Sequence, residues 1–210
     1  MQYKQINAAL RRRTWFCRAM GGSRMGLRRG LLLDRDGVVN RDDGYVGSAD
    51  RFVFMPHAFS FLREAQDCGY RLAIVTNQSG VARGLYSAEA FEAVTGWMLE
   101  RLQLEGITID LALACFEHPE GKAEVYRRES FWRKPNPGMM LEAVQRLRLD
   151  PARSIALGDS VRDMEAARAA GIGLRWHLGP KEAPDSFVQK NGVLRVYDLE
   201  QAREELKDCS

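Results

Sequence analysis

Two aspartates at the end of the first apolar run are the residues best suited to chemistry. Asp34 and Asp36 follow Leu31, Leu32 and Leu33 in the stretch LLLDRDG, where a buried strand is expected to end. Side chains two residues apart on an extended segment point to the same side, so both carboxylates face one small volume. Two like charges this close call for a cation or a shared proton, and a hard dication such as Mg²⁺ suits an oxygen-only site. One carboxylate is then free to act as a nucleophile and the other as a proton donor, although the pair alone also fits a solvated turn.

The second polar loop, VTNQSGVARG, offers groups that can hold phosphate oxygens. It closes an apolar run, and its glycines let backbone N–H groups approach a ligand closely. The candidate phosphate-binding groups are the side chains of Thr76 and Asn77 and the backbone N–H groups of Gln78, Ser79 and Gly80. Arg83 follows in the same loop, and its guanidinium can bind the non-reacting part of a phosphorylated substrate; an ordinary surface arginine is the alternative.

Two later loops supply cations and further carboxylates. In WRKPNPG, two prolines keep Arg133 and Lys134 in an extended segment, which suits a positioned cation better than a solvated pair. Lys134 would offset the negative charge of a nucleophile and a phosphate. In LGDSVRD, Asp159 follows a predicted strand and is the natural third metal carboxylate, and Asp163 lies one helical turn later on the same face.

The segments between these loops predict a parallel sheet covered by helices. Short runs rich in Leu and β-branched residues alternate with longer stretches of helical period. The predicted strands are residues 30–33, 71–76, 111–115, 154–157, 174–177 and 193–196, and the predicted helices are residues 58–68, 87–105, 138–147, 161–170 and 199–207. This order predicts an α/β fold, with a Rossmann-like parallel sheet sandwiched by helices and no large cap domain. Two connections, 37–56 and 116–137, are long enough to be functional or disordered.

The first 29 residues differ in charge from the rest of the chain. They carry eight basic side chains and no acidic one, which leaves 23 of the 31 basic residues against 28 acidic ones in the remainder. A basic leader of this kind fits a disordered extension, a nucleic-acid arm or a transit peptide. We predict that residues 1–29 lie outside the fold and that residues 30–210 form a single domain. Met20 and Met25, just before the first predicted strand, further suggest a start codon placed too early.

Composition sets limits on compartment and partners. No run of 18 apolar residues and no secretory signal occurs in the 210 residues, so no membrane contact is expected and the predicted location is the cytoplasm. The four cysteines show no Cys-x-x-Cys pair and are expected to be free thiols. A monomer is expected. Nucleic acid is not an expected partner, because the part of the chain beyond the leader is acidic.

The four loops together resemble the haloacid dehalogenase-like phosphatase superfamily. Its motif order is Asp-x-Asp, then Thr or Ser, then Lys, then Gly-Asp with a following Asp, and residues 31–177 match it in sequence. More narrowly, DRDGVVN, TNQSGVARG, HPEG and RKPNPGM resemble the subgroup of D-glycero-D-manno-heptose 1,7-bisphosphate 7-phosphatases and histidinol-phosphate phosphatases. The resemblance implies a Mg²⁺-dependent phosphomonoesterase that acts on a small phosphorylated metabolite through an aspartyl-phosphate intermediate.

The resemblance also assigns roles to residues. It implies that Asp34 attacks phosphorus, and that Asp36 protonates the leaving oxygen and later deprotonates the hydrolytic water. It implies that Mg²⁺ binds Asp34, the carbonyl of Asp36 and Asp159. The phosphoryl oxygens would be held by Thr76, Asn77 and Lys134, and Asp163 would orient Lys134 or the groups around the metal.

Alternatives to the heptose bisphosphate remain open on the sequence. Histidinol phosphate is a rival substrate within the same chemistry, and polynucleotide 3′ ends are a rival because related phosphatases act on them. A binding module that keeps the fold without catalysis is a third interpretation. Ser160 stands where heptose members often carry Lys, which weakens the substrate assignment but not the reaction class.

The loop after residue 115 departs from the subgroup. Many members hold it with zinc bound by Cys and His, but here Cys115 is accompanied by Glu117, Ser130 and Trp132 at the positions of the other ligands. Structural zinc takes four Cys or His ligands in a tetrahedral array. We therefore predict no structural zinc, with Phe116, Phe131 and Trp132 packing in its place. His118 lies in this loop with its role left open, while His57 and His177 have no nucleophile partner and are discounted.

Overall fold

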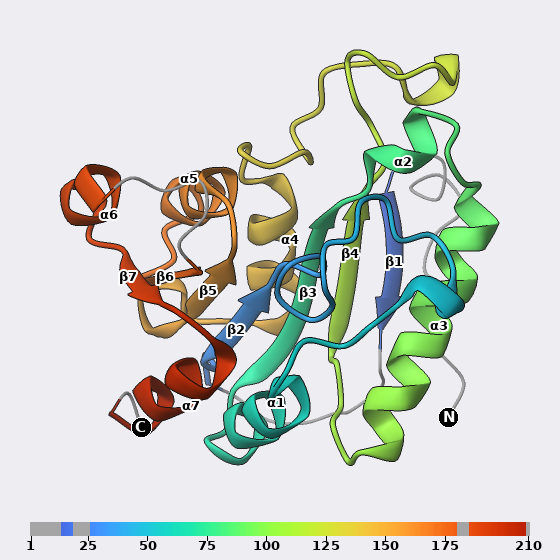
Figure 1. The fold of residues 1–210 in the computed structure, drawn as a ribbon. Helices are drawn as coiled ribbons and strands as arrows, with labels where there is room; N and C mark the ends of the chain where they lie inside the picture. The colour runs from blue at the N-terminus through green and yellow to red at the C-terminus, as the bar shows by residue number, and fades with distance from the viewer. Residues whose placement is uncertain (1–13, 19–25, 180–184, 209–210) are drawn as a thin grey trace.

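A seven-stranded sheet forms the centre of the molecule. The computed structural model describes residues 14–18, 26–179 and 185–208. The strands are β1 (Thr14–Arg18), β2 (Gly30–Leu33), β3 (Arg71–Asn77), β4 (Leu111–Cys115), β5 (Ile155–Gly158), β6 (Leu174–Leu178) and β7 (Leu194–Val196). They lie in the order β1-β4-β3-β2-β5-β6-β7, and the six strands from β4 to β7 run parallel. The predicted Rossmann-like sheet is therefore confirmed (Figure 1).

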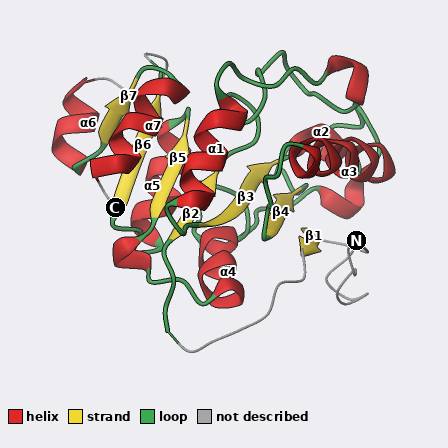
Figure 2. Cartoon of the chain, turned by 90° about the horizontal axis from the view of Figure 1, so that it is seen from below, coloured by secondary structure: helices red, strands yellow, loops and turns green. Residues whose placement is uncertain are grey.

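Helices cover both faces of this sheet. They are α1 (Ala58–Asp67), α2 (Ser79–Ala82), α3 (Ala88–Leu104), α4 (Gly138–Leu147), α5 (Val161–Ala169), α6 (Asp185–Asn191) and α7 (Leu199–Asp208). Alternation along β2 sends Leu31 and Leu33 to the core formed with α1, α3 and α7, and Leu32 to the core formed with α4 and α5. Figure 2 shows α3 and α4 on opposite sides of the strands. The sheet is apolar on both faces because both are covered.

The first strand corrects the prediction for the leader. Residues Thr14–Arg18 pair antiparallel with β4, with Thr14 opposite Cys115 and Arg18 opposite Leu111. This part of residues 1–29 therefore belongs to the sheet, and the expectation that the whole leader lies outside the fold is wrong for it. Residues 26–29 also lead directly into β2, and the Arg28 N–H donates to Arg148 O at 3.0 Å. Residues 1–13 and 19–25, including Met20 and Met25, lie outside the described residues.

Both long connections pack onto the same domain. In the first, between β2 and α1, Val38, Val46 and Phe52 are buried in the core shared with α3, and the Phe52 ring lies 5.5 Å from the Trp97 ring. In the second, between β4 and α4, Phe116 is buried against Phe91 and Tyr126. Neither connection forms a separate cap in the part of the chain that the structure describes. Among the same residues, every helix is too short or too polar to cross a membrane.

Candidate active site

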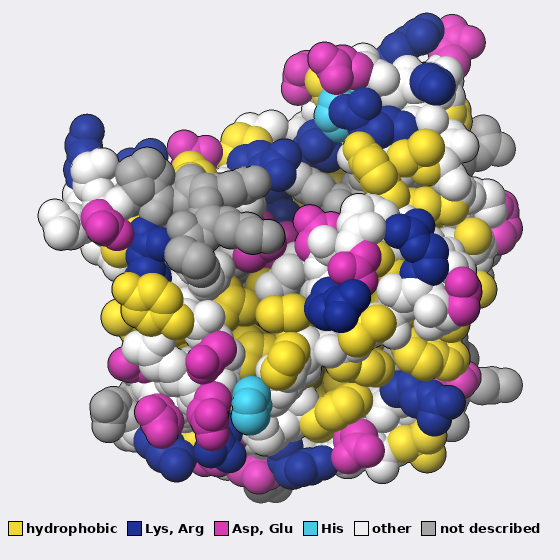
Figure 3. Space-filling model, viewed as in Figure 1, with side chains coloured by type: hydrophobic (Ala, Val, Ile, Leu, Met, Phe, Trp, Pro, Cys, Tyr) yellow, Lys and Arg dark blue, Asp and Glu magenta, His cyan; other side chains and the backbone are white. Residues whose placement is uncertain are grey.

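The carboxyl ends of β2, β3 and β5 and the loop after β4 enclose a pocket of about 380 Å³. All of the residues predicted for the site line it, namely Asp34, Asp36, Thr76, Asn77, Gln78, Ser79, Gly80, Arg83, Arg133, Lys134 and Asp159. Figure 1 shows the loop between β4 and α4 rising above this edge of the sheet. On the same face in Figure 3, basic side chains gather below that loop with carboxylates beside them. Ligands of parallel α/β sheets bind at such an edge.

Lys134 is the buried centre of the site. Its side chain is 2% exposed, and its Nζ lies 3.1 Å from Asp34 Oδ1 and 2.5 Å from Asp163 Oδ1. The ammonium also donates to Val75 O at 2.8 Å, so its three protons have three acceptors. Burial lowers the pKa of Lys134, but Asp163 and Asp34 together outweigh it and raise the pKa above its ordinary value. Lys134 is therefore a fixed positive charge beside Asp34.

Asp34 lies where a nucleophile is needed. Its side chain is 15% exposed and lines the pocket, and Oδ1 accepts the Arg35 N–H at 2.7 Å. Burial raises the pKa of Asp34 to about 6, aided by Asp163 and Asp36, while Lys134 lowers it. Without Lys134 the carboxyl group would hold its proton more strongly. The lysine thus keeps Asp34 ionised near neutral pH, as a carboxylate nucleophile requires.

Three carboxylates crowd one side of the pocket. Asp34, Asp159 and Asp163 each offer an oxygen, and these oxygens lie within 4.8 Å of one another. Burial and the neighbouring Asp34 and Asp163 raise the pKa of Asp159 to about 8. Gly37, at φ +80°, leaves room for this carboxylate, because a Cβ there would lie 2.0 Å from Asp159 Oδ2. The donor set fits a hard divalent cation, which would neutralise the crowded charge.

Asp163 is already committed to other partners. Its Oδ2 accepts the Ser160 hydroxyl at 2.7 Å and the Ser160 N–H at 3.1 Å, closing a capping box at the start of α5. Its Oδ1 pairs with Lys134. Asp34 and Asp159 are then the two carboxylates left for a metal. Of the two roles implied for Asp163, the geometry favours the orientation of Lys134.

Asp36 is held by a ring of donors. Arg35 contacts both oxygens of the carboxylate through Nη2, at 2.8 and 3.0 Å, and Asn40 donates to Oδ1 at 2.9 Å. Gln78 Nε2 donates to Oδ2 at 2.7 Å. Arg35 is itself 1% exposed, donates to Val46 O at 2.9 Å and lies over the rings of Phe52 and Phe91. The second aspartate thus has a fixed orientation beside the first.

The loop after β3 is arranged differently from the sequence expectation. Asn77 exchanges two hydrogen bonds with the backbone of Lys134, at 3.0 and 3.1 Å, so its side chain positions the lysine segment. The Gln78 N–H donates to Cys115 O at 2.7 Å and is not directed to a phosphate. Ser79 and Gly80 open α2 and line the pocket, and the first N–H groups of a helix have no partner within it. They remain candidate phosphate donors together with Thr76.

Basic side chains form the rim of the pocket. Arg83, Arg133 and Arg162 line it, and Arg83 Nη2 lies 3.1 Å from His118 Nε2. Burial, Arg162 and Arg83 lower the pKa of Arg133, and its buried Nη1 has no hydrogen-bond partner among the residues that the structure describes. Burial, Arg133 and Arg83 likewise lower the pKa of His118. This rim, which we call the arginine rim, is suited to an anion.

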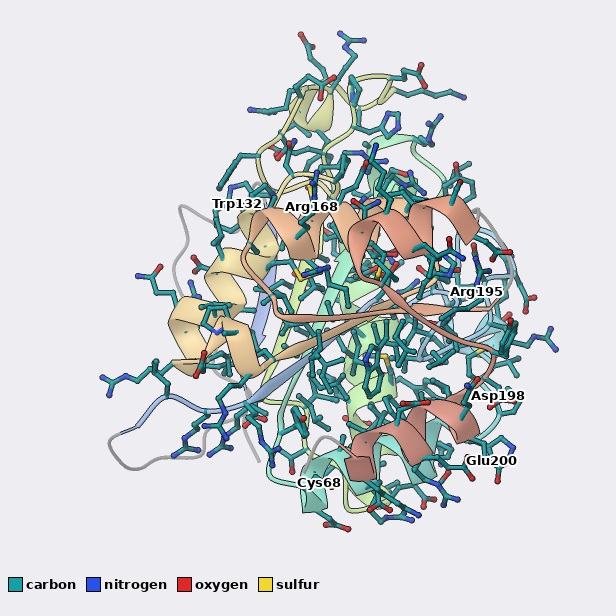
Figure 4. All side chains as sticks on the ribbon, turned by 90° about the vertical axis from the view of Figure 1, so that its left-hand side faces the viewer. Cys68, Trp132, Arg168, Arg195, Asp198 and Glu200 are labelled. Carbon is teal, nitrogen blue, oxygen red and sulfur yellow. The ribbon has the colours of Figure 1, made fainter. Side chains whose placement is uncertain are left out.

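The loop above the pocket is held by side chains at the positions of the zinc ligands. Cys115 is buried with Sγ 3.9 Å from Ser130 Oγ, and Glu117, 3% exposed, pairs with Arg128 at 3.3 Å. Trp132 packs partly buried against the α4 core, and Figure 4 shows it at the base of the loop. Phe131 is 58% exposed, so the prediction that it packs inside is wrong. The expected lack of structural zinc stays a prediction.

The comparisons with known proteins agree with this geometry. Residues 3–171 match the haloacid dehalogenase-like hydrolases. The chain belongs to this family. The resemblance inferred from the motifs, and with it the hydrolase class, is confirmed.

Individual relatives extend over most of the chain. The sequence is 44% identical over 160 residues to a D-glycero-beta-D-manno-heptose-1,7-bisphosphate 7-phosphatase of Rhodopseudomonas palustris, covering 76% of this chain and 87% of the relative. It is 40% identical over 167 residues to a D-glycero-alpha-D-manno-heptose-1,7-bisphosphate 7-phosphatase of Burkholderia mallei, covering 80% and 88%. A crystal structure of a D,D-heptose 1,7-bisphosphate phosphatase from B. bronchiseptica, in complex with magnesium and phosphate, has a TM-score of 0.74 and 29% identity, covering 87% of this chain and 99% of that one.

Sequence reasoning missed some residues of the pocket. Asp42, Tyr45 and Tyr86 line the pocket but belong to no recognised motif, and Arg162 lines it from within the motif LGDSVRD without having been singled out. The signal that could have found them is the length of the loop that carries Asp42 and Tyr45, which already suggested a functional role. The discounted histidines lie elsewhere, His57 at the start of α1 and His177 buried at the end of β6.

Proposed function

We propose that this hydrolase is a phosphomonoesterase in which Asp34 is the nucleophile. The observation that carries the proposal is the position of Asp34, which faces the pocket with the buried ammonium of Lys134 3.1 Å from its Oδ1. A carboxylate oxygen of Asp34 attacks phosphorus, the bond from phosphorus to the leaving oxygen breaks, and Asp36 gives that oxygen its proton. Water then attacks the aspartyl phosphate, Asp36 takes the proton of the water, and inorganic phosphate leaves with Asp34 restored.

The proposed metal is Mg²⁺, held by Asp34, Asp159 and the carbonyl of Asp36. Crowding of carboxylates within 4.8 Å supports a dication at this place. When bound, Mg²⁺ neutralises charge on the phosphoryl group and fixes its orientation. Phosphoryl transfer depends mainly on positioning and charge stabilisation, which this chain supplies from Lys134, Thr76 and the backbone of Ser79 and Gly80.

The proposed substrate is a D-glycero-D-manno-heptose 1,7-bisphosphate, cleaved at the 7-phosphate. The names of the relatives support it, and so does the arginine rim, because a substrate with two phosphates needs a second anion-binding region away from Asp34. Arg133 is the best candidate for that phosphate, because its buried Nη1 finds no acceptor within the described part of the chain. Arg83 is a weaker candidate, because it already contacts His118 and Glu120.

The test is Mg²⁺-dependent phosphate release from a panel of substrates. The panel contains both anomers of the heptose 1,7-bisphosphate, histidinol phosphate, other sugar phosphates and a 3′-phosphorylated oligonucleotide, with Asp34→Asn as the inactive control. Preferential turnover of a heptose bisphosphate that is lost in the control supports reaction and substrate together. Preferential turnover of another compound refutes the heptose assignment alone. If no compound releases phosphate, the proposed phosphatase activity is refuted.

Two predictions from composition stay predictions. The cytoplasmic location and the monomeric state are tested by fractionation of the native cells and by light scattering of the purified chain. A stable dimer in solution would contradict the second.

A further inference from the structure

The hydroxyl of Tyr86 is linked to Asp36 through the side chain of Gln78. Tyr86 Oη lies 2.6 Å from Gln78 Oε1, and the Nε2 of the same amide lies 2.7 Å from Asp36 Oδ2 and 3.0 Å from Thr76 Oγ1. Gln78 is 2% exposed, so water does not compete freely for either end of its amide. The three side chains form a continuous chain of hydrogen bonds.

Chemistry fixes the direction of these hydrogen bonds. The amide nitrogen of Gln78 faces Asp36. When Asp36 is ionised, as it must be to take the proton of the hydrolytic water, its oxygens only accept, so this orientation is the one that binds it and the amide oxygen faces Tyr86. Tyr86 must then donate its proton to Gln78. Burial raises the pKa of Tyr86 to about 12, so the phenol keeps this proton throughout the neutral range. The hydroxyl therefore holds the amide in the one orientation that binds the carboxylate.

Two glycines make room for the ring of Tyr86. A Cβ on Gly47 would lie 2.5 Å from Tyr86 Cδ1, and a Cβ on Gly80 would lie 2.3 Å from Cε1. Gly47 belongs to the connection after β2 and Gly80 to α2, so the ring packs closely against both segments. A side chain so confined holds its hydroxyl in place at little further entropic cost.

We propose that Tyr86 is a positioning residue for the proton-transfer group Asp36 and acts through Gln78. Asp36 Oδ1 accepts from Asn40 and Arg35, whereas Oδ2 accepts from Arg35 at 3.0 Å and from Gln78 at 2.7 Å, so Gln78 is the closest donor that fixes the position of Oδ2. Loss of the Tyr86 hydroxyl frees the Gln78 amide to turn. Oδ2 then loses the donor that fixes its position toward the leaving oxygen.

The positioning role rests on the proposed phosphatase activity. It predicts a loss of activity that depends on the leaving group, which a general loosening of the site would not produce. In the first step the bond from phosphorus to the leaving oxygen breaks while Asp36 delivers a proton to that oxygen. An alkoxide leaving group, as in a sugar phosphate, needs this proton, whereas the p-nitrophenolate of p-nitrophenyl phosphate leaves without it. The value of kcat/KM reports the steps up to the aspartyl phosphate, so it isolates this proton transfer from the later hydrolysis.

The experiment compares Tyr86→Phe with the wild type on both kinds of substrate. We expect kcat/KM for a sugar phosphate to fall about tenfold, the effect of one lost buried hydrogen bond, and kcat/KM for p-nitrophenyl phosphate to change less than about twofold. The matched control is Tyr126→Phe, which removes the hydroxyl of another partly buried tyrosine, packed on Phe116 and not part of the lining of the pocket that contains Asp36. The control should leave both values unchanged. Equal losses on both substrates in Tyr86→Phe, or no loss on either, would overturn the proposal.

A double-mutant cycle tests whether Tyr86 acts through Gln78. Gln78→Met should reproduce the selective loss on the sugar phosphate, and adding Tyr86→Phe to it should cost less than about twofold more. Additive losses would refute a route through Gln78. If the wild type itself releases no phosphate from any substrate, the proposed function fails. If the wild type is active and Tyr86→Phe leaves kcat/KM unchanged on both substrates, only the positioning role is refuted.

Discussion

In the metal-free protein, the free energy of unfolding should fall as the pH rises. In the metal-free site, burial and neighbouring carboxylates raise the pKa of Asp159 from 3.8 to about 8. A carboxyl group with a folded-state pKa above its unfolded value stabilises the fold fully at low pH, and the stabilisation is lost as pH rises toward the folded pKa. The window therefore runs from about pH 4 to pH 8.

The size of the effect follows from the shift. Each pH unit inside the window costs about 1.4 kcal/mol for Asp159, so the free energy of unfolding should fall by about 4 kcal/mol between pH 5 and pH 8. Asp34, with a pKa raised to about 6, adds about 1 kcal/mol near the lower end. For a chain of 210 residues this corresponds to a fall in Tm of roughly 10 °C or more.

The pH dependence of stability is measured by thermal unfolding in EDTA and in saturating Mg²⁺, at pH 5, 6, 7 and 8. The Tm in EDTA should fall across the series, and Mg²⁺ should raise the Tm far more at pH 8 than at pH 5. The control is Asp159→Asn, which carries no charge at any pH. Its metal-free Tm should exceed that of the wild type at pH 8, and it should fall less steeply with pH. Groups that titrate in both proteins contribute equally, so the difference between the two slopes reports Asp159. A metal-free wild type whose Tm is flat or rises from pH 5 to pH 8 would refute the reasoning.

Four further outcomes are expected. Lys134→Met should lower kcat/KM at least about 1,000-fold and destabilise the fold by about 3 to 5 kcal/mol, because it leaves buried carboxylates without their cation; near-normal turnover would contradict this role. Gly37→Ala should weaken Mg²⁺ binding at least about tenfold, measured by calorimetry, because its Cβ would meet Asp159; unchanged affinity would be inconsistent with the metal site. Arg133→Met should raise KM about tenfold or more for a bisphosphate and little for p-nitrophenyl phosphate, and equal effects on both would exclude the second-phosphate role. Metal analysis of the protein purified without chelators should find no tightly held zinc, and one zinc per chain would overturn that prediction.

Much of the site was predictable because it depends on where strands end. The motifs with Asp34, Thr76 and Asp159 each follow an apolar run, and parallel strands bring their carboxyl ends to one edge whatever the details of the loops. The order of the motifs then narrowed the chemistry. Helix and strand positions followed from the period of apolar residues and were correct to within one or two residues for every predicted element.

What could not be predicted depends on contacts between distant segments. The strand Thr14–Arg18 is embedded in a basic segment, and only its pairing with β4, about a hundred residues later, gives it a place in the sheet. The helix α6 was missed because Asp185–Asn191 is largely polar and gave no clear helical period. The burial of Arg35 could not be predicted either, because arginine is rarely buried without a partner and its pairing with Asp36 is visible only in the structure. The direction of the Asn77 side chain and of the Gln78 N–H could not be predicted either, because it depends on the distant Lys134 backbone and on Cys115 O, to which the structure turns them.

The double engagement of Asp163 limits how this enzyme can change. One carboxylate oxygen starts helix α5 through Ser160 and the other fixes the ammonium of Lys134. Asn at this position would keep a cap and lose the charge beside the lysine, and Glu would keep the charge and displace it by one methylene. Asp163 packs directly against the backbone of Gly158, since a Cβ added at Gly158 would lie 2.3 Å from the Asp163 Cβ, so the longer side chain of Glu has little room there. A substitution at Asp163 therefore changes the start of helix α5 and the position of the Lys134 ammonium together. Helix stability and the active site cannot be altered separately at this residue.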